Sequence, residues 1–212
     1  MNLSLTLLAI MLIVFVLQLV FPAITNTFVF VPDYAFSEPW RFFTSMFLHD
    51  GFLHILFNGY ALFMFGSMLE RRVSKKDFLT IFFVGGLMAG LFYYLTVFSP
   101  WPPLCEAPDG GVWACPALGA SGAVYAILGA CAMLLPEMVV YLWFFPVKMR
   151  YAWIIWMLIE IVGAVSPGTG IANAAHLGGL IFGLIYGWYL SKKEQAFYQP
   201  TWETRDTTWE QA

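Results

Sequence analysis

Charged residues are scarce in this chain of 212 residues. Asp, Glu, Lys and Arg make up 11% of it, and 60% of the residues are hydrophobic. Soluble domains carry about 25% charged residues, so this composition excludes a sizeable soluble domain and is typical of a membrane protein. The chain also lacks an internal repeat and a nucleotide-binding glycine loop. The net charge of −3 is unremarkable. We expect no nucleic-acid partner, no metal and no cofactor.

Long apolar runs fill most of the chain. Runs near or above the ~20 residues that cross a bilayer occur six times, at about 4–22, 51–69, 78–98, 117–135, 150–165 and 172–190. The first run lacks a basic start and an A-x-A-like cleavage site, so we interpret it as a retained helix rather than a signal peptide. The sequence thus predicts an all-α membrane protein, with a six-helix bundle over residues 1–190 and a polar tail over 191–212.

Lys and Arg are distributed unevenly between the loops. Arg41 alone falls in one set of loops, and the other nine lie on the opposite side: Arg71, Arg72, Lys75, Lys76, Lys148, Arg150, Lys192, Lys193 and Arg205. Cytoplasmic loops carry the excess of positive charge. We therefore expect both termini and the tail in the cytoplasm, and the loops 23–50, 99–116 and 166–171 on the outer side.

Polar side chains inside a bilayer are costly, so each is a functional candidate. His54, Ser121 and His176 occur in the first turns of the second, fourth and sixth segments, which all run from outside to inside. The three side chains are therefore expected at one depth in the outer half of the membrane. Asn58 lies one turn after His54, on the same helical face. A packing role for the serine and a structural His54–Asn58 pair remain open, and His49 is equally well explained as an interfacial residue.

Small residues mark a close helix contact. Gly179, Gly183 and Gly187 recur every four residues in the sixth segment, a pattern that lets another helix approach closely. Ser121, Tyr125 and Gly129 share one face of the fourth segment. If the two faces meet, Ser121 approaches His176.

A serine beside a histidine is the minimum set for nucleophilic catalysis. We expect no carboxylate well placed to orient the histidine, because Glu160 is the only one well within a span. Tyr125, one turn after Ser121, is instead expected to stack on the ring of His176. The prediction is a Ser–His dyad rather than a triad. His54, Asn58 and the Ser121 N–H are candidate donors to an oxyanion.

The motifs on the second, fourth and sixth segments resemble those of the rhomboid intramembrane serine proteases. The resemblance runs from "EPWRFFTSMFLHDGFLHILFNGY" through "GASGAVYAILGA" to "AHLGG". It implies that Ser121 is the nucleophile, that His176 is the general base and acid, and that Tyr125 stacks on His176. It also implies that His54 and Asn58 stabilise the oxyanion together with the Ser121 N–H.

Further positions match the same family pattern outside the catalytic set. Gly119 corresponds to the first glycine of the G-x-S-G motif, and Gly179 to a helix-contact glycine. Trp40 and Arg41 match the "WR" of the first outer loop, and Glu70 resembles a structural glutamate at the inner end of the second helix.

The expected function is intramembrane serine endopeptidase activity on transmembrane protein substrates, in contact with membrane lipid. The minimal six-helix form favours a prokaryotic plasma membrane, with the active site opening outward. One alternative is a non-catalytic relative that binds membrane proteins for quality control; such proteins typically lack the serine or the histidine. A channel or transporter would require polar residues through the inner halves of the segments, which are almost wholly apolar here.

Three cysteines occur, of which Cys131 lies in the fourth segment and is expected to be buried. Cys105 and Cys115 lie in the outer loop that leads to Ser121. Thiols on the outer side of a plasma membrane can be oxidised, so we expect a disulfide between them, with two free thiols as the alternative.

Overall fold

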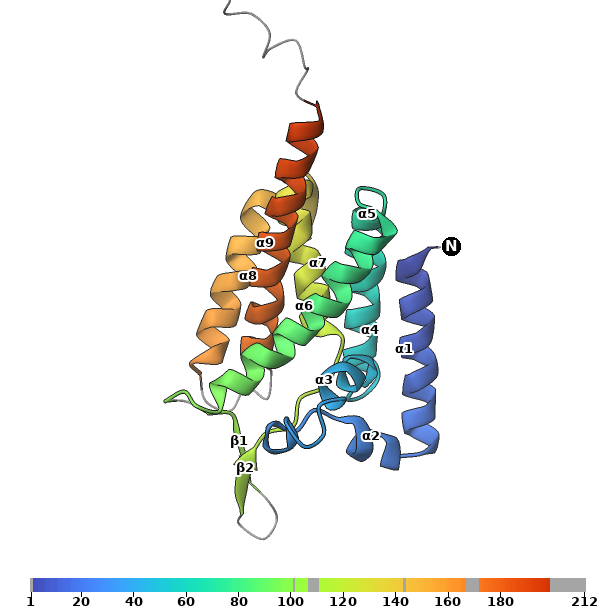
Figure 1. The fold of residues 1–212 in the computed structure, drawn as a ribbon, viewed down its shortest axis with the longest axis vertical. Coiled ribbons are helices and arrows are strands. Elements are labelled where there is room, and N and C mark those ends of the chain that lie inside the picture. Colours follow the sequence, from blue (N-terminus) through green and yellow to red (C-terminus); the bar gives the residue numbers. More distant parts are fainter. Residues whose placement is uncertain (1, 101, 107–110, 143, 167–171, 199–212) are drawn as a thin grey trace, which may run out of the picture.

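Helices packed side by side make up most of the computed structural model, which describes residues 2–100, 102–106, 111–142, 144–166 and 172–198 (Figure 1). The long helices are α1 (Leu3–Val20), α6 (Lys75–Thr96), α7 (Ser121–Leu134), α8 (Met149–Ala164) and α9 (Asn173–Tyr198). A further helix from Phe52 to Glu70 is interrupted by a π-helical turn, and consists of α4 (Phe52–Ala61), η3 (Leu62–Gly66) and α5 (Ser67–Glu70). The described part of the chain is a helical membrane bundle.

Glu70, at the end of α5, holds the start of α1. Its carboxylate accepts hydrogen bonds from the backbone N–H groups of Leu3 (2.6 Å) and Ser4 (3.1 Å) and from the Ser4 hydroxyl (3.0 Å). The first N–H groups of a helix have no partner within the helix, and the helix dipole favours a negative charge there. This glutamate therefore connects the start of α1 to the C-terminal end of α5.

The segment between α1 and α4 folds into short helices: α2 (Ala23–Phe28), η1 (Pro32–Tyr34), α3 (Arg41–Thr44) and η2 (Ser45–Phe47). Arg41 is buried and donates to the carbonyl oxygens of Asn26 (2.9 Å) and Val29 (2.8 Å), and it pairs with Glu38. A buried guanidinium needs such acceptors, and here they tie α3 to the end of α2. Trp40, its neighbour, is half-exposed.

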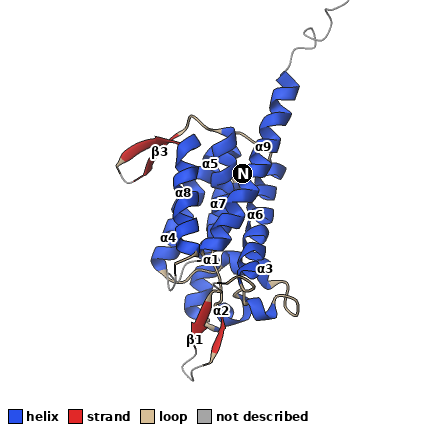
Figure 2. Cartoon of the chain, turned by 90° about the vertical axis from the view of Figure 1, so that its left-hand side faces the viewer, coloured by secondary structure: helices blue, strands red, loops and turns tan. Residues whose placement is uncertain are grey.

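Two antiparallel hairpins lie at opposite ends of the bundle (Figure 2). One pairs β1 (Leu104–Glu106) with β2 (Val112–Ala114), and the other pairs β3 (Val139–Leu142) with β4 (Phe145–Lys148). The first hairpin lies at the end where α7 and α9 begin, so it neighbours the functional candidates.

Helix α7 lies in the middle of the bundle (Figure 1). All of its residues are buried except Ser121, Tyr125 and Met133. At 1.5 Å per residue its 14 residues span about 21 Å, less than the ~30 Å of a bilayer core. A helix this short, placed centrally, leaves room for a cavity beside its first residue.

Helices α7 and α9 touch backbone to backbone. A Cβ atom added to Gly179 would lie 2.0 Å from the carbonyl oxygen of Gly122, and one added to Gly183 would lie 2.0 Å from that of Ala126. From the other side, a Cβ on Gly129 would lie 2.4 Å from the carbonyl oxygen of Leu180. The two small-residue faces inferred from the sequence therefore meet, and no side chain larger than hydrogen fits at Gly179 or Gly183.

Several helix boundaries differ from those expected. Helix α7 begins at Ser121 rather than 117, because residues before it form an extended bridge between Ala117 and Phe30 and a turn at Gly119. Helix α6 begins at Lys75 rather than 78, where the Ser74 hydroxyl caps it by accepting from the Asp77 N–H (3.1 Å).

Helix α9 continues past residue 190, to Tyr198, and the division between bundle and tail at 190 stays a prediction. The apolar run ends near residue 190, but the residues that follow still favour a helical conformation. The remainder of the expected tail, residues 199–212, lies outside the described residues. Among the described helices, Leu3–Val20, Phe52–Glu70 and Lys75–Thr96 are long and apolar enough to cross a membrane. The count of six spans stays a prediction.

Candidate active site

Ser121 and His176 meet at the end of the α7–α9 contact where both helices begin. Ser121 is the first residue of α7, and His176 lies in the first turn of α9. The hydroxyl oxygen of Ser121 is 2.8 Å from Nε2 of His176, a normal hydrogen-bond distance. An imidazole nitrogen at this distance can accept the hydroxyl proton as the serine oxygen attacks a carbonyl carbon.

The Tyr125 ring fixes the orientation of the imidazole. Its centroid lies 4.4 Å from that of His176, and the two ring planes differ by 7°. Because Tyr125 is one turn after Ser121 on α7, the same helix supplies both the hydroxyl group and the platform for the ring. The imidazole is thereby restricted to a plane in which Nε2 faces the serine.

Glu160 corrects the expectation that no carboxylate is well placed beside the histidine. Its side chain is buried on α8, with Oε2 3.0 Å from Nδ1 of His176. The Tyr125 hydroxyl donates to Oε1, and Asn173 Nδ2 donates to Oε2 at 2.6 Å. The sequence contained the signal, since a lone carboxylate within a span is itself unusual, but the spacing along the chain does not reveal its distance from His176.

Gly119 brings two side chains of α4 close to the serine. Its φ of +120° is a conformation that favours glycine, and its N–H donates to the carbonyl of Ser45 (2.9 Å). A Cβ at this position would lie 2.7 Å from Nε2 of His54 and 3.6 Å from Nδ2 of Asn58. Glycine is therefore needed both for the turn and for the space beside these nitrogen atoms.

The two nitrogen atoms are hydrogen-bond donors that point into this space. The Asp50 N–H donates to Nδ1 of His54 (3.2 Å), so the proton of the neutral ring is on Nε2. Asn58 is buried, and Nδ2 has no hydrogen-bond partner among the residues that the structure describes. A buried donor without a partner is costly. Its presence here fits a site that receives an acceptor oxygen during a reaction.

A cavity of about 1480 Å³ opens beside these groups. Residues of α4, α7, α8 and α9 line it, among them His54, Asn58, Ser121, Trp156 and His176. Its volume is ample for water and an extended peptide segment. Within the described part of the chain, no cluster of His, Cys, Asp and Glu could hold a metal ion.

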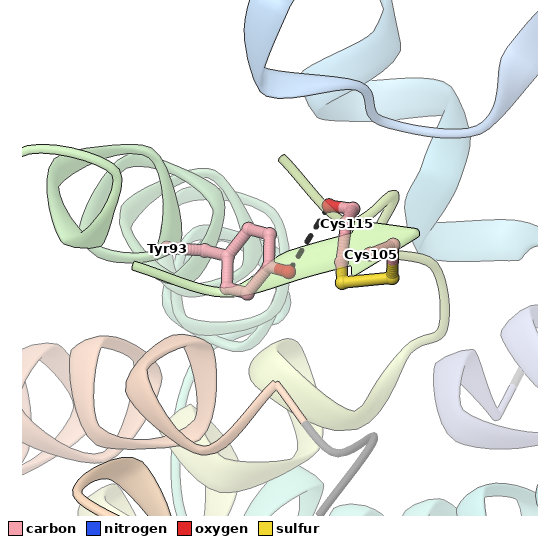
Figure 3. The surroundings of a disulfide bond; sticks show 3 residues. All are labelled: Tyr93, Cys105 and Cys115. Carbon is pink, nitrogen blue, oxygen red and sulfur yellow. Dashed lines mark hydrogen bonds between the residues drawn. A yellow bond between two sulfur atoms is a disulfide. The ribbon is translucent and has the colours of Figure 1, made fainter. Parts of the chain in front are cut away.

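A disulfide borders the same cavity and leads into the serine helix. Cys105 and Cys115 are joined across the β1–β2 hairpin, and Figure 3 shows the Tyr93 hydroxyl donating to the carbonyl oxygen of Cys115 (3.1 Å). In the chain-entropy model, closing a loop of this size contributes about 3 kcal/mol. The covalent link and the Tyr93 bond together fix the chain at Cys115, shortly before α7 begins at Ser121. Cys131 is buried and free.

The family model of the rhomboid domain matches residues 37–193. This chain belongs to the rhomboid family. A mitochondrial relative, rhomboid protein 1 of Saccharomyces cerevisiae, is 33% identical over 70% of this chain and 41% of its own length. Rhomboid protease GlpG of Haemophilus influenzae is 32% identical over 74% of this chain and 72% of its own. Rhomboid protease AarA of Providencia stuartii is 30% identical over 69% of this chain and 54% of its own length.

Family membership confirms the resemblance noted from the sequence motifs. It identifies the chain as an integral membrane protein of a family of intramembrane serine proteases, and both bacterial relatives carry the name protease. The chain spans less than two thirds of the length of the yeast and Providencia relatives. The matched region contains all the rhomboid-motif residues described above.

His49 lies before α4 and packs edge-on against His54, with ring centroids 5.1 Å apart. Nδ1 faces the carbonyl oxygen of Phe47 (3.2 Å), and the buried Nε2 has no partner among the described residues. Burial, and secondarily the neighbouring His54, lower the pKa of His49 to about 4 from its usual 6.5, against a smaller opposing effect of the Phe47 carbonyl. His49 is therefore a neutral structural residue at neutral pH.

This lowered pKa predicts a loss of stability in mild acid. Between pH 6.5 and about 4 the unfolded chain binds a proton at His49 that the folded chain does not, so the free energy of unfolding falls as the pH falls through this window. We expect the melting temperature in detergent to drop less between pH 7 and pH 5 in His49→Gln than in the wild type. Equal drops in both proteins would contradict this account of His49.

Proposed function

We propose that this chain is a serine endopeptidase that cleaves transmembrane segments of membrane proteins near the outer face of the membrane. The observation that carries the proposal is the 2.8 Å contact between the Ser121 hydroxyl and Nε2 of His176 beside a large cavity. Family membership supports the same chemistry. The pair supplies a nucleophile and a base, which are the two groups that hydrolysis through an acyl-enzyme requires.

In the first half of the reaction, the Ser121 oxygen attacks the carbonyl carbon of the scissile peptide bond, and His176 Nε2 accepts its proton. The resulting tetrahedral intermediate collapses when His176 returns the proton to the leaving amine, which breaks the C–N bond. In the second half, water attacks the acyl-enzyme ester, with His176 again as base and then as acid. Ser121 is thereby restored.

The negative oxygen of the intermediate would be held by donors already in place. His54 Nε2–H and Asn58 Nδ2 flank Gly119, and the first N–H groups of α7, including that of Ser121, have no partner within the helix. Donors fixed before the reaction stabilise the developing charge without reorganisation. The unpartnered Asn58 Nδ2, within the described part of the chain, is the strongest support for this assignment.

We propose six spans within residues 1–190, with both termini and the tail in the cytoplasm of a prokaryote and the cavity open to the outside. The uneven distribution of Lys and Arg supports this orientation. The shortness of α7 supports a site below the membrane surface but within reach of water.

Substrates of such a site are transmembrane helices in surrounding lipid, and they have to unwind before Ser121 can reach a peptide carbonyl. Helix-weakening residues such as Gly and Pro near the scissile bond should promote cleavage. A small residue just before the cut suits this site because the site is crowded. Even a Cβ atom added to Gly119 would lie only 2.7 Å from Nε2 of His54.

Replacement of either member of the pair is expected to abolish proteolysis. Ser121→Ala removes the nucleophile and His176→Ala removes the base, while both leave the glycine contact of α7 and α9 intact, so the melting temperature should change little. The measurement is cleavage of a single-pass transmembrane substrate by purified protein in detergent. Residual cleavage above a few per cent in either variant would contradict the proposal. Binding without cleavage by the wild type would favour the non-catalytic alternative.

Removal of an oxyanion donor should be less severe. We expect His54→Ala and Asn58→Ala each to lower kcat by up to ~10²–10³-fold, the usual range for one lost donor. KM should change little, because these donors bind the developing oxyanion more strongly than the substrate carbonyl. Wild-type turnover in both single variants and in the double variant would rule out a catalytic role for α4.

A further inference from the structure

Glu160 is a buried carboxylate with polar partners on two neighbouring helices. It lies in the middle of α8, its side chain is 5% exposed, and most residues around it on this helix are apolar. Its oxygen atoms face His176 Nδ1 (3.0 Å), the Tyr125 hydroxyl and Asn173 Nδ2 (2.6 Å). These three groups come from α7 and α9, so one side chain of α8 connects to both helices of the proposed catalytic pair.

The surroundings are shaped to hold this carboxylate. Gly163 lies three residues after Glu160, and a Cβ there would be 2.4 Å from Asn173 Nδ2. Any larger residue at this position would displace the amide that donates to Glu160. An ionised carboxylate in an apolar interior is costly unless it is paired and hydrogen-bonded. Two neutral donors meet part of this requirement, and a positively charged imidazole would meet the rest.

The position of His176 explains why the carboxylate matters for the reaction. Nε2 faces Ser121 and must be unprotonated to accept the hydroxyl proton, so the proton of the neutral ring has to be on Nδ1. Nδ1 is buried, and no hydrogen bond of full geometry reaches it among the residues that the structure describes. The polar atom that it faces is Oε2 of Glu160, which accepts but cannot donate when ionised.

We propose that Glu160 is a positioning residue that completes a Ser121–His176–Glu160 triad, an inference that rests on the proposed protease function. The carboxylate selects the Nδ1-protonated form of His176, turns Nε2 toward Ser121, and stabilises the imidazolium that forms when the serine proton is transferred. No proton passes to Glu160 in this scheme. Tyr125 and Asn173 keep the carboxylate in place.

The first test measures the proton position on His176 in the wild-type protein and needs no variant of Glu160. The chain has three histidines, so histidine-selective ¹⁵N labelling gives a spectrum in which His176→Ala identifies the His176 signals. We expect a protonated Nδ1 and an unprotonated Nε2 at neutral pH. A neutral ring with its proton on Nε2 would overturn the proposal.

The second test compares the kinetics of Glu160→Gln with the wild type on a transmembrane substrate. The amide keeps the size of the side chain but removes the charge. We expect kcat to fall by about 10²-fold, with KM little changed; the corresponding amide substitution in a Ser–His–Asp triad costs ~10⁴-fold. The ¹⁵N spectrum of this variant should no longer show the proton held on Nδ1 of His176, because the amide can donate as well as accept and so does not select the ring form that carries the proton there.

Asn173→Ala is the matched control, because it removes a contact to Glu160 without changing the charge beside His176. Ser121 and Tyr125 on α7 contact the His176 ring, and both are retained in the two variants. We expect a smaller loss of kcat in Asn173→Ala, with the proton of the neutral His176 ring still on Nδ1. A purely structural Glu160 would make the two variants alike, with the proton of His176 on the same nitrogen as in the wild type in both.

Glu160→Asp provides the conservative variant should the amide protein fail to fold. It should recover part of kcat and keep the proton of the neutral His176 ring on Nδ1. Wild-type kcat in Glu160→Gln, with the proton of His176 still on Nδ1, would overturn the proposal while leaving the protease function intact. Cleavage that persists in Ser121→Ala would instead contradict the protease function itself.

Discussion

The backbone contact between α7 and α9 is the constraint on which the site depends. A Cβ atom added to Gly179 or Gly183 would lie only 2.0 Å from a carbonyl oxygen of α7. Helices that approach this closely are held by van der Waals packing, which in a bilayer replaces much of the hydrophobic driving force. With the axes fixed at this separation, the first residue of α7 and the first turn of α9 come within hydrogen-bond distance.

The polar groups around this contact differ in how many hydrogen-bond partners they have. Glu160 has donors on both helices, His176 is bracketed by Ser121, Tyr125 and Glu160, and Asn58 Nδ2 has no hydrogen-bond partner among the described residues. Inside a medium of low dielectric constant such groups interact strongly and are costly when unpaired. The arrangement is consistent with a base held rigidly in the resting state and with donors reserved for a charge that appears during the reaction.

Much of this arrangement could be predicted from the sequence because it depends on local periodicity. Glycine at every fourth position of α9 and the small residues of α7 indicated the close contact, and a histidine and a serine at the two helix starts indicated what it brings together. The ends of the helices were less predictable from hydropathy. A hydropathy pattern does not show that Ser74 caps α6, so that the helix begins at Lys75. It also does not show that the polar residues after 190 favour helix, so that α9 ends at Tyr198.

The features that were missed depend on distances between helices far apart in the chain. Glu160 lies on a different helix from His176, and its proximity to Nδ1 follows from how α8 packs, which periodicity does not encode. The β1–β2 and β3–β4 hairpins were also missed, because their strands are only three and four residues long. The positive φ of Gly119 is a further feature that appears only when the turn before α7 is built.

The most direct test of the central claim is the rate at which a fluorophosphonate labels Ser121 when the helix contact is disturbed without changing any reacting group. Gly179→Ala would place a Cβ against the Gly122 carbonyl and separate the helices, and a misplacement of about 1 Å can cost ~10²-fold in rate. In the control Gly90→Ala the new Cβ meets the Phe42 ring edge at 2.9 Å, and this side chain can move. Intact-protein mass spectrometry should show near wild-type labelling in Gly90→Ala and labelling slower by about 10²-fold in Gly179→Ala. Wild-type labelling of Gly179→Ala would contradict the claim that this contact sets the distance between serine and histidine.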